Sequence, residues 1–133
     1  MRTFSHVMVF VCWVLTLCPA VSSSEEAPPG FNRHIVLQKP LEGAVGQDVT
    51  VLIAEFAAGT SLGRHYHTGH NIVYILEGEL SREYDGEDPV MLLPGDADYE
   101  VPERVHNTTA VGRVRALVVN INPSGAEPTV GVE

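Results

Sequence analysis

Cysteine is almost absent from this 133-residue chain, and so are long apolar runs. Both cysteines, Cys12 and Cys18, lie near the start. The remainder therefore has no thiol and no disulfide, and its fold must be stabilised by an apolar core or partly by a bound metal ion. A chain of this length has room for one domain.

The longest apolar run, VMVFVCWVLTL at positions 7–17, is too short to cross a membrane, which requires about twenty residues. It follows a positively charged start at Arg2 and precedes small residues. This three-part pattern is typical of a signal peptide. We expect residues 1–22 to be cleaved and the protein to be secreted or periplasmic. The alternative is a membrane anchor through residues 7–22.

Positive charge is also scarce. Lys39 is the only lysine, and eight Lys and Arg residues against 17 Asp and Glu give a net charge of −9. Nucleic-acid binding requires a basic patch, and the sequence contains none. We therefore expect no nucleic-acid partner. The negative net charge is expected to keep the protein soluble and to attract cations weakly.

No window of the sequence has the apolar spacing and caps of a helix. Short alternating or β-branched runs are separated by Gly and Pro, as in strands. We expect strands at 34–40, 48–56, 71–78, 79–85, 90–96, 97–102, near 106, and at 113–121. This pattern predicts an all-β sandwich or barrel of the jelly-roll type.

The strand pattern sets the expected domain limits. Residues 23–33, with paired prolines, form a linker between the leader and the domain. The folded domain then spans 34–121. The Pro- and Gly-rich tail, 122–133, is expected to be loose or to extend a sheet edge.

Three histidines fall within the six positions 65–70. His65 and His67 are two residues apart, so on a strand both imidazoles share one face. His106 lies near the start of a later strand, and an antiparallel fold can bring it beside the pair. Three imidazoles on one centre suit zinc, iron, copper or nickel. The alternative for a His-x-His pair is polar decoration on the rim of a sheet.

Two segments resemble the paired motifs of the cupin superfamily and together cover about residues 31–121. They are GTSLGRHYHTGHNIVYILEGEL, residues 59–80, and PGDADYEVPERVHNTT, residues 94–109. The positions that fit are Gly59, His65, His67, Gly78, Gly95, Pro102 and His106. The resemblance implies a small single-domain, type-2-like cupin: a double-stranded β-helix, or RmlC-like jelly-roll barrel, with a metal in its mouth.

The superfamily's usual ligands are the two histidines and the glutamate of the first motif and the histidine of the second. Carried over, they become His65, His67, position 71 and His106. Position 71 is Asn, a neutral and weaker ligand than a carboxylate. His70 is a substitute if the register shifts by one residue. If the alternation from His67 holds, odd positions point inward and His70 faces out.

The second motif also departs from the family pattern. Its segment PERVH is one residue shorter than the common form, and Arg104 stands near the place where a glycine is usual. A bulge would absorb the difference.

The resemblance implies a divalent-metal cofactor (Fe, Mn, Ni, Cu or Zn) and a dioxygenase-type reaction on a small organic substrate. Two alternatives remain open: a non-enzymatic module that binds a small molecule or sugar at a degenerate metal site, and an isomerase or epimerase with His65 or His106 as base. Tyr74, Tyr99 and Arg64 are candidate substrate-binding residues. Cupins commonly form homodimers through sheet edges, and 34–40 is the candidate edge strand.

Overall fold

The computed structural model describes residues 27–133 as ten strands without a helix. The expected signal peptide, residues 1–22, and residues 23–26 of the expected linker lie outside the described residues, so the signal peptide stays a prediction. Within residues 27–133 there is no helix with the length and apolar character to span a membrane.

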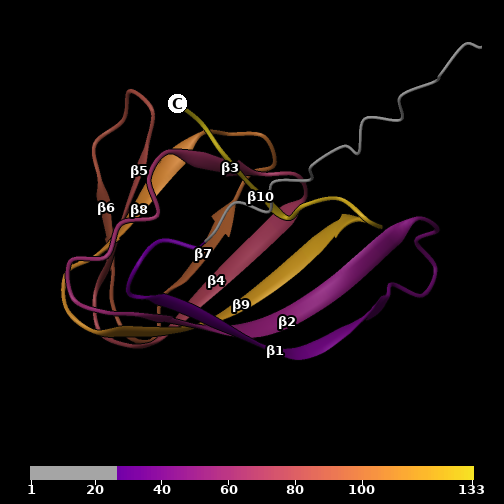
Figure 1. Ribbon diagram of the computed structural model, residues 1–133, viewed down its shortest axis with the longest axis horizontal. Helices are drawn as coiled ribbons and strands as arrows, with labels where there is room; N and C mark the ends of the chain where they lie inside the picture. The colour runs from indigo at the N-terminus through magenta and orange to yellow at the C-terminus, as the bar shows by residue number, and fades with distance from the viewer. Residues whose placement is uncertain (1–26) are drawn as a thin grey trace, which may run out of the picture.

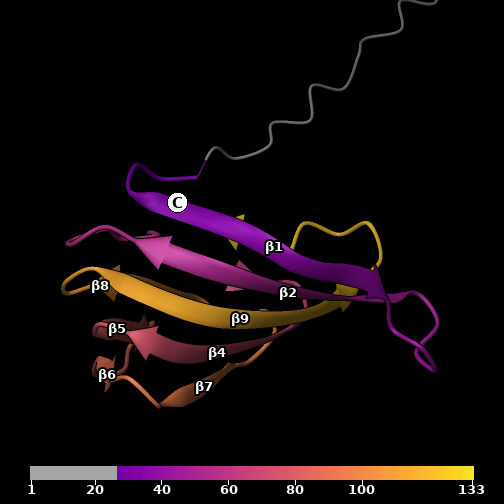
Figure 2. The same ribbon diagram turned by 90° about the horizontal axis from the view of Figure 1, so that it is seen from below.

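The strands form two facing antiparallel sheets (Figures 1 and 2). The larger sheet has the order β1-β2-β9-β4-β7, and the smaller sheet has the order β10-β3-β8-β5-β6. The larger sheet consists of β1 (Phe31–Pro40), β2 (Gln47–Phe56), β9 (Val114–Pro123), β4 (His70–Glu77) and β7 (Ala97–Glu100). The smaller consists of β10 (Thr129–Gly131), β3 (His65–His67), β8 (His106–Ala110), β5 (Leu80–Tyr84) and β6 (Val90–Leu92). The expected all-β jelly roll is confirmed.

The structure differs from the expected strands at both ends of the domain. β1 begins at Phe31, inside the segment expected to be linker, and the C-terminal tail contributes β10. β10 pairs with β3, where Thr129 lies opposite His67. The tail therefore extends the smaller sheet. β1 lies at the edge of the larger sheet, as expected, and exposes Ile35 and Leu37.

The apolar core lies between the two sheets, because strand alternation sends every second side chain inward. In β4, Val73 and Ile75 are buried, whereas Ile72 and Tyr74 on the other face are exposed. The core cluster contains Leu52, Ala54, Phe56, Val73, Ile75, Leu80, Leu92, Ala110, Val114 and Ala116. Burial of these side chains removes apolar surface from water and supplies the main stabilisation of the barrel.

Two glycines allow close approaches that a side chain would block. A Cβ on Gly69 would overlap the carbonyl oxygen of Ile121, and a Cβ on Gly78 would overlap the carbonyl of Arg113. Gly78 also has a φ of 82°, in the left-handed region that favours glycine. Gly69 lies in the turn between β3 and β4, and its close approach to Ile121 lets this turn pass against β9 of the larger sheet.

Truncation of the central core residue Ile75 tests this packing. Ile75 is 1% exposed, so Ile75→Ala leaves a cavity and should lower the free energy of unfolding by about 2–5 kcal/mol. The matched control is Leu76→Ala on the opposite face, where the side chain is partly exposed and the loss should be much smaller. Urea denaturation followed by circular dichroism measures both. Equal losses would contradict the assigned inward register of β4.

Candidate metal centre

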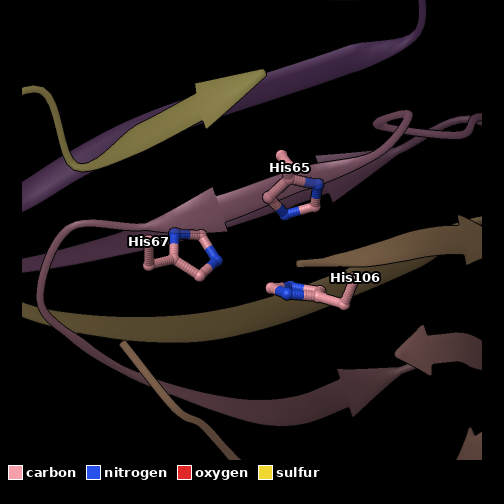
Figure 3. Close-up of side chains that lie close together, drawn as sticks. All are labelled: His65, His67 and His106. Carbon is pink, nitrogen blue, oxygen red and sulfur yellow. The ribbon is translucent and has the colours of Figure 1, made fainter. Parts of the chain in front are cut away.

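Three histidines from two strands meet between the sheets (Figure 3). β3 carries His65 and His67, whose side chains share a face because they are two residues apart. β8 carries His106, which is the cross-strand partner of His65. All three are buried, and one ligand atom from each lies within 4.8 Å of the others. The structure thus brings together the three histidines that the sequence singled out.

Each imidazole is held by a hydrogen bond from Nδ1 to a backbone carbonyl. The acceptors are the carbonyls of Gly63 for His65 (2.9 Å), Pro128 for His67 (3.1 Å) and Arg104 for His106 (3.1 Å). A carbonyl only accepts, so each Nδ1 donates its proton and Nε2 of the neutral ring carries a lone pair. This outer arrangement is the one that fixes the tautomer and orientation of metal-binding histidines.

The carboxylate of Glu100 lies against this cluster. Its Oε2 is 2.9 Å from Nε2 of His67, and its Oε1 is 3.4 Å from Nε2 of His106. Glu100 is in β7, directly opposite Asn71 of β4, and is 3% exposed. Glu100 is not one of the cupin motif positions that fit this sequence. The alternation of β7 was the available signal, because it places Asp98 and Glu100 on the inward face.

Burial and charge shift the pKa values of the cluster in different directions. Burial lowers the pKa of His65 to about 4. Burial acts to raise the pKa of Glu100, but contacts with His106 and His67 outweigh it and hold that pKa well below its usual range. Burial acts to lower the pKa of His106, whereas the Glu100 carboxylate raises it overall. The carboxylate is therefore the anionic group of the site.

Asn71 faces the cluster, but through its amide nitrogen. Nδ2 donates a hydrogen bond to Oε2 of Glu100 and lies 3.1 Å from Nε2 of His67. Its Oδ1 is buried and has no hydrogen-bond partner among the described residues. In this arrangement Asn71 supports Glu100 and does not present its oxygen to the three histidines.

His70 lies on the other face of β4, in agreement with the reading in which odd positions point inward. It is exposed, and its Nδ1 is hydrogen-bonded to the hydroxyl of Tyr99 at 2.5 Å. The suggested substitution of His70 for the missing carboxylate does not fit this geometry, because strand alternation turns the side chain away from His65, His67 and His106.

The three candidate substrate-binding residues also lie outside the cavity. Tyr74 and Tyr99 are on the exposed face of the larger sheet. The exposed Arg64 forms a 2.5 Å ion pair with Asp85 and donates a hydrogen bond to the carbonyl of Glu133. Its guanidinium is thus engaged with protein acceptors. The tyrosines point outward because of strand alternation, and Arg64 is held at the surface by its contacts with Asp85 and the C-terminal tail.

A cavity of about 410 Å³ adjoins the cluster. Its lining includes His65, His67, Asn71 and Glu100. Apolar side chains, mainly from the larger sheet, form much of the remaining wall. They are Phe31, Leu52, Ala54, Phe56, Leu62, Val73, Leu80, Ala116 and Val118. A small organic molecule fits such a cavity, with its apolar part along the wall and a polar group at the histidines.

The loop between β7 and β8 absorbs the irregular second motif. Glu103 has a φ of 60°, the one positive φ at a non-glycine residue in the described part of the chain. Its backbone N–H donates a 2.8 Å hydrogen bond to the carbonyl of His67. The turn that a glycine usually makes therefore falls on Glu103, next to Arg104, and ties the loop that carries His106 to β3.

Sequence comparison places these residues in a known family. The model of the family described as "Cupin domain" matches residues 52–121, more than half of the chain. The chain belongs to the cupin family. The match contains His65, His67 and His106, so the structural cluster lies within the cupin domain. None of the curated proteins compared with this cupin is detectably similar to it.

Solved structures share the fold. KdgF from Halomonas sp. is 26% identical, with a TM-score of 0.59, and the alignment covers 74% of this chain and 84% of that one. A double-stranded β-helix protein from Klebsiella pneumoniae is 20% identical, with a TM-score of 0.62 and coverages of 81% and 89%. The DMSP lyase DddQ from Ruegeria pomeroyi is 23% identical, with a TM-score of 0.62 and coverages of 77% and 52%. The last two likenesses establish the fold alone.

The strained position in the β7–β8 loop generates a prediction. Glycine adopts positive φ without the Cβ penalty, so Glu103→Gly should raise the free energy of unfolding by up to about 1 kcal/mol. Glu103→Ala is the matched control, because it removes the same carboxylate but keeps Cβ. Thermal and urea unfolding compare the two variants. A Glu103→Gly protein no more stable than Glu103→Ala would show that the loop stores no strain at this residue.

Proposed function

We propose that this cupin binds one divalent metal ion through His65, His67 and His106 and holds a small organic ligand beside it. The observation that carries the proposal is the common orientation of the three rings: each Nδ1 is committed to a backbone carbonyl, and the three Nε2 lone pairs converge. Nε2 of His106 is buried with no hydrogen bond among the described residues, and Oε1 of Glu100 lies 3.4 Å from it.

The donor set fits the first-row divalent ions. Imidazole nitrogens suit iron, nickel, copper and zinc, and a nearby carboxylate also suits manganese. When bound, such an ion would supply Lewis acidity and, for iron, manganese, nickel or copper, a centre for oxygen chemistry.

The cavity supports a small organic acid as the ligand class. Arg33 is the one Lys or Arg among the described residues that line the cavity. Its guanidinium can pair with a carboxylate of the ligand, while the apolar wall buries the hydrocarbon part and excludes water. The reaction that we propose for such a ligand is a dioxygenase-type oxidation, since three imidazole ligands leave coordination positions for a substrate and oxygen.

Metal content tests the first part of the proposal. The protein, purified without a histidine tag or chelator, should contain close to one equivalent of iron, manganese, nickel, copper or zinc by inductively coupled plasma mass spectrometry. His106→Ala should reduce the content at least tenfold, because it removes one of three convergent ligands. His34→Ala is the control, since His34 is exposed on β1 and should leave metal content unchanged.

Two results would contradict a three-histidine centre. One is a wild-type protein that contains no metal and takes up neither iron nor zinc when these are added. The other is a His106→Ala variant that keeps the wild-type metal content while remaining folded by circular dichroism.

Nitric oxide tests the open position that a dioxygenase requires. As a surrogate for oxygen, it should bind to the Fe(II)-loaded protein anaerobically and produce the electron paramagnetic resonance signal of an iron–nitrosyl complex. The zinc-loaded protein, which has no iron to form this complex, is the control. An Fe(II)-loaded protein that gives no such signal would contradict the dioxygenase reading and leave the metal centre as a binding or structural site.

A further inference from the structure

We infer that Glu100 is a fourth metal ligand and supplies, from the neighbouring strand, the carboxylate that position 71 lacks. The inference rests on the metal centre proposed above and concerns its ligand set. Its basis is the position of both Glu100 oxygens beside two of the three convergent imidazole nitrogens.

The separations match those of atoms that share one ion. Two ligand atoms each about 2.1 Å from a metal, at octahedral or tetrahedral angles, lie about 3.0–3.4 Å apart. The Glu100 oxygens are 2.9 Å and 3.4 Å from Nε2 of His67 and of His106, respectively. No shift of β7 is needed to bring the carboxylate to the centre.

The hydrogen-bond chemistry favours a cation at this point. Nδ1 of His67 donates to the Pro128 carbonyl, so Nε2 of the neutral ring is an acceptor. The ionised carboxylate of Glu100 also only accepts. Two acceptors 2.9 Å apart repel each other unless a donor, a proton or a metal ion satisfies both, and the one donor among the described residues that contacts both is the Nδ2 amide of Asn71. A divalent ion satisfies His67, His106 and Glu100 together, whereas one proton satisfies a single pair.

Burial makes the same demand. Glu100 is 3% exposed, and among the described residues it forms no ion pair with Lys or Arg. Arg82 is paired with Asp98, two residues before Glu100, at 2.6 Å. An ionised carboxylate is expensive to bury without a positive partner, and a bound metal ion provides one.

Cross-strand pairing explains why position 71 is an amide. Asn71 and Glu100 are direct partners between β4 and β7. A glutamate at 71 would place a second buried carboxylate against Glu100, and like charges that share a site repel. Asn71 instead donates its amide N–H to Glu100 and fixes the carboxylate toward the histidines. The carboxylate that the family pattern places at position 71 is therefore supplied by Glu100 on β7, and Asn71 supports it by a hydrogen bond.

Zinc titration of the chelator-treated full chain provides the test, with a competing chelator to measure affinity. Glu100→Gln keeps the side-chain volume and removes the charge, so zinc affinity should fall at least tenfold. The control is Glu103→Gln, which removes an equal charge from an exposed position nearby and should change zinc affinity less than threefold. This comparison separates ligation from the effect of net charge.

The exchanged pair is the second variant. Asn71→Glu combined with Glu100→Gln returns the carboxylate to β4 and lets the new amide on β7 support it. Its zinc affinity should be within about threefold of wild type, since the carboxylate again reaches the same ion. The absorption spectrum of the Co(II)-loaded protein should change for Glu100→Gln and not for Glu103→Gln, because only the first alters the ligand set. Circular dichroism confirms that each variant is folded.

The outcomes separate this inference from the proposed function. A wild-type protein that binds neither zinc nor cobalt would overturn both. Wild-type binding with full affinity and an unchanged Co(II) spectrum in folded Glu100→Gln would overturn the role of Glu100 and leave the three-histidine centre intact. If Glu100→Gln does not fold, the exchanged pair decides: restored affinity supports a shared carboxylate role, and a folded exchanged pair with at least tenfold weaker zinc binding overturns it.

Discussion

The site depends on three hydrogen bonds that hold the imidazole rings by their outer nitrogens. Because Nδ1 of His65, His67 and His106 each donates to a backbone carbonyl, the three Nε2 atoms turn inward with their lone pairs. Two of these carbonyls are local, two residues before the histidine. The third belongs to Pro128, so the C-terminal tail and β10 hold the ring of His67. Backbone carbonyls of the barrel thereby orient the three imidazole rings so that their Nε2 atoms face one another.

The inner face of the larger sheet is divided along its length. One end is packed with apolar side chains such as Ile75 and Val114, and this end stabilises the barrel. The other end carries a cross-strand row of polar residues in which Asn120 of β9, Asn71 of β4 and Glu100 of β7 are successive partners. Oδ1 of Asn71 and of Asn120 is buried there without a hydrogen-bond partner in the described residues. Such unpaired polar atoms cost free energy, and they concentrate where a ligand can satisfy them.

Strand alternation connects the fold to the site and also limits what the site can use. It sends Asn71 and Glu100 inward with the core, and it sends His70, Tyr74 and Tyr99 to the outer face. Whether a polar residue can take part in the site therefore depends on which face of its strand it occupies and on which strand it pairs with. Arg33 enters the cavity by the same rule, because its partner across β1 and β2 is the buried Ala54.

The sequence by itself determined the all-β class, most strand positions, the cupin motifs and the three histidines, because alternation, turn residues and motif spacing are local properties of the chain. It also showed that position 71 had lost the expected carboxylate. Only the tertiary structure decided that Glu100 lies beside the histidines, since that contact depends on which strand pairs with β4 and in which register. The role of the tail was likewise beyond local pattern, because β10 is three residues long and is defined by its pairing with β3. Short strands and cross-strand partners are fixed by long-range hydrogen bonding, which no sequence window contains.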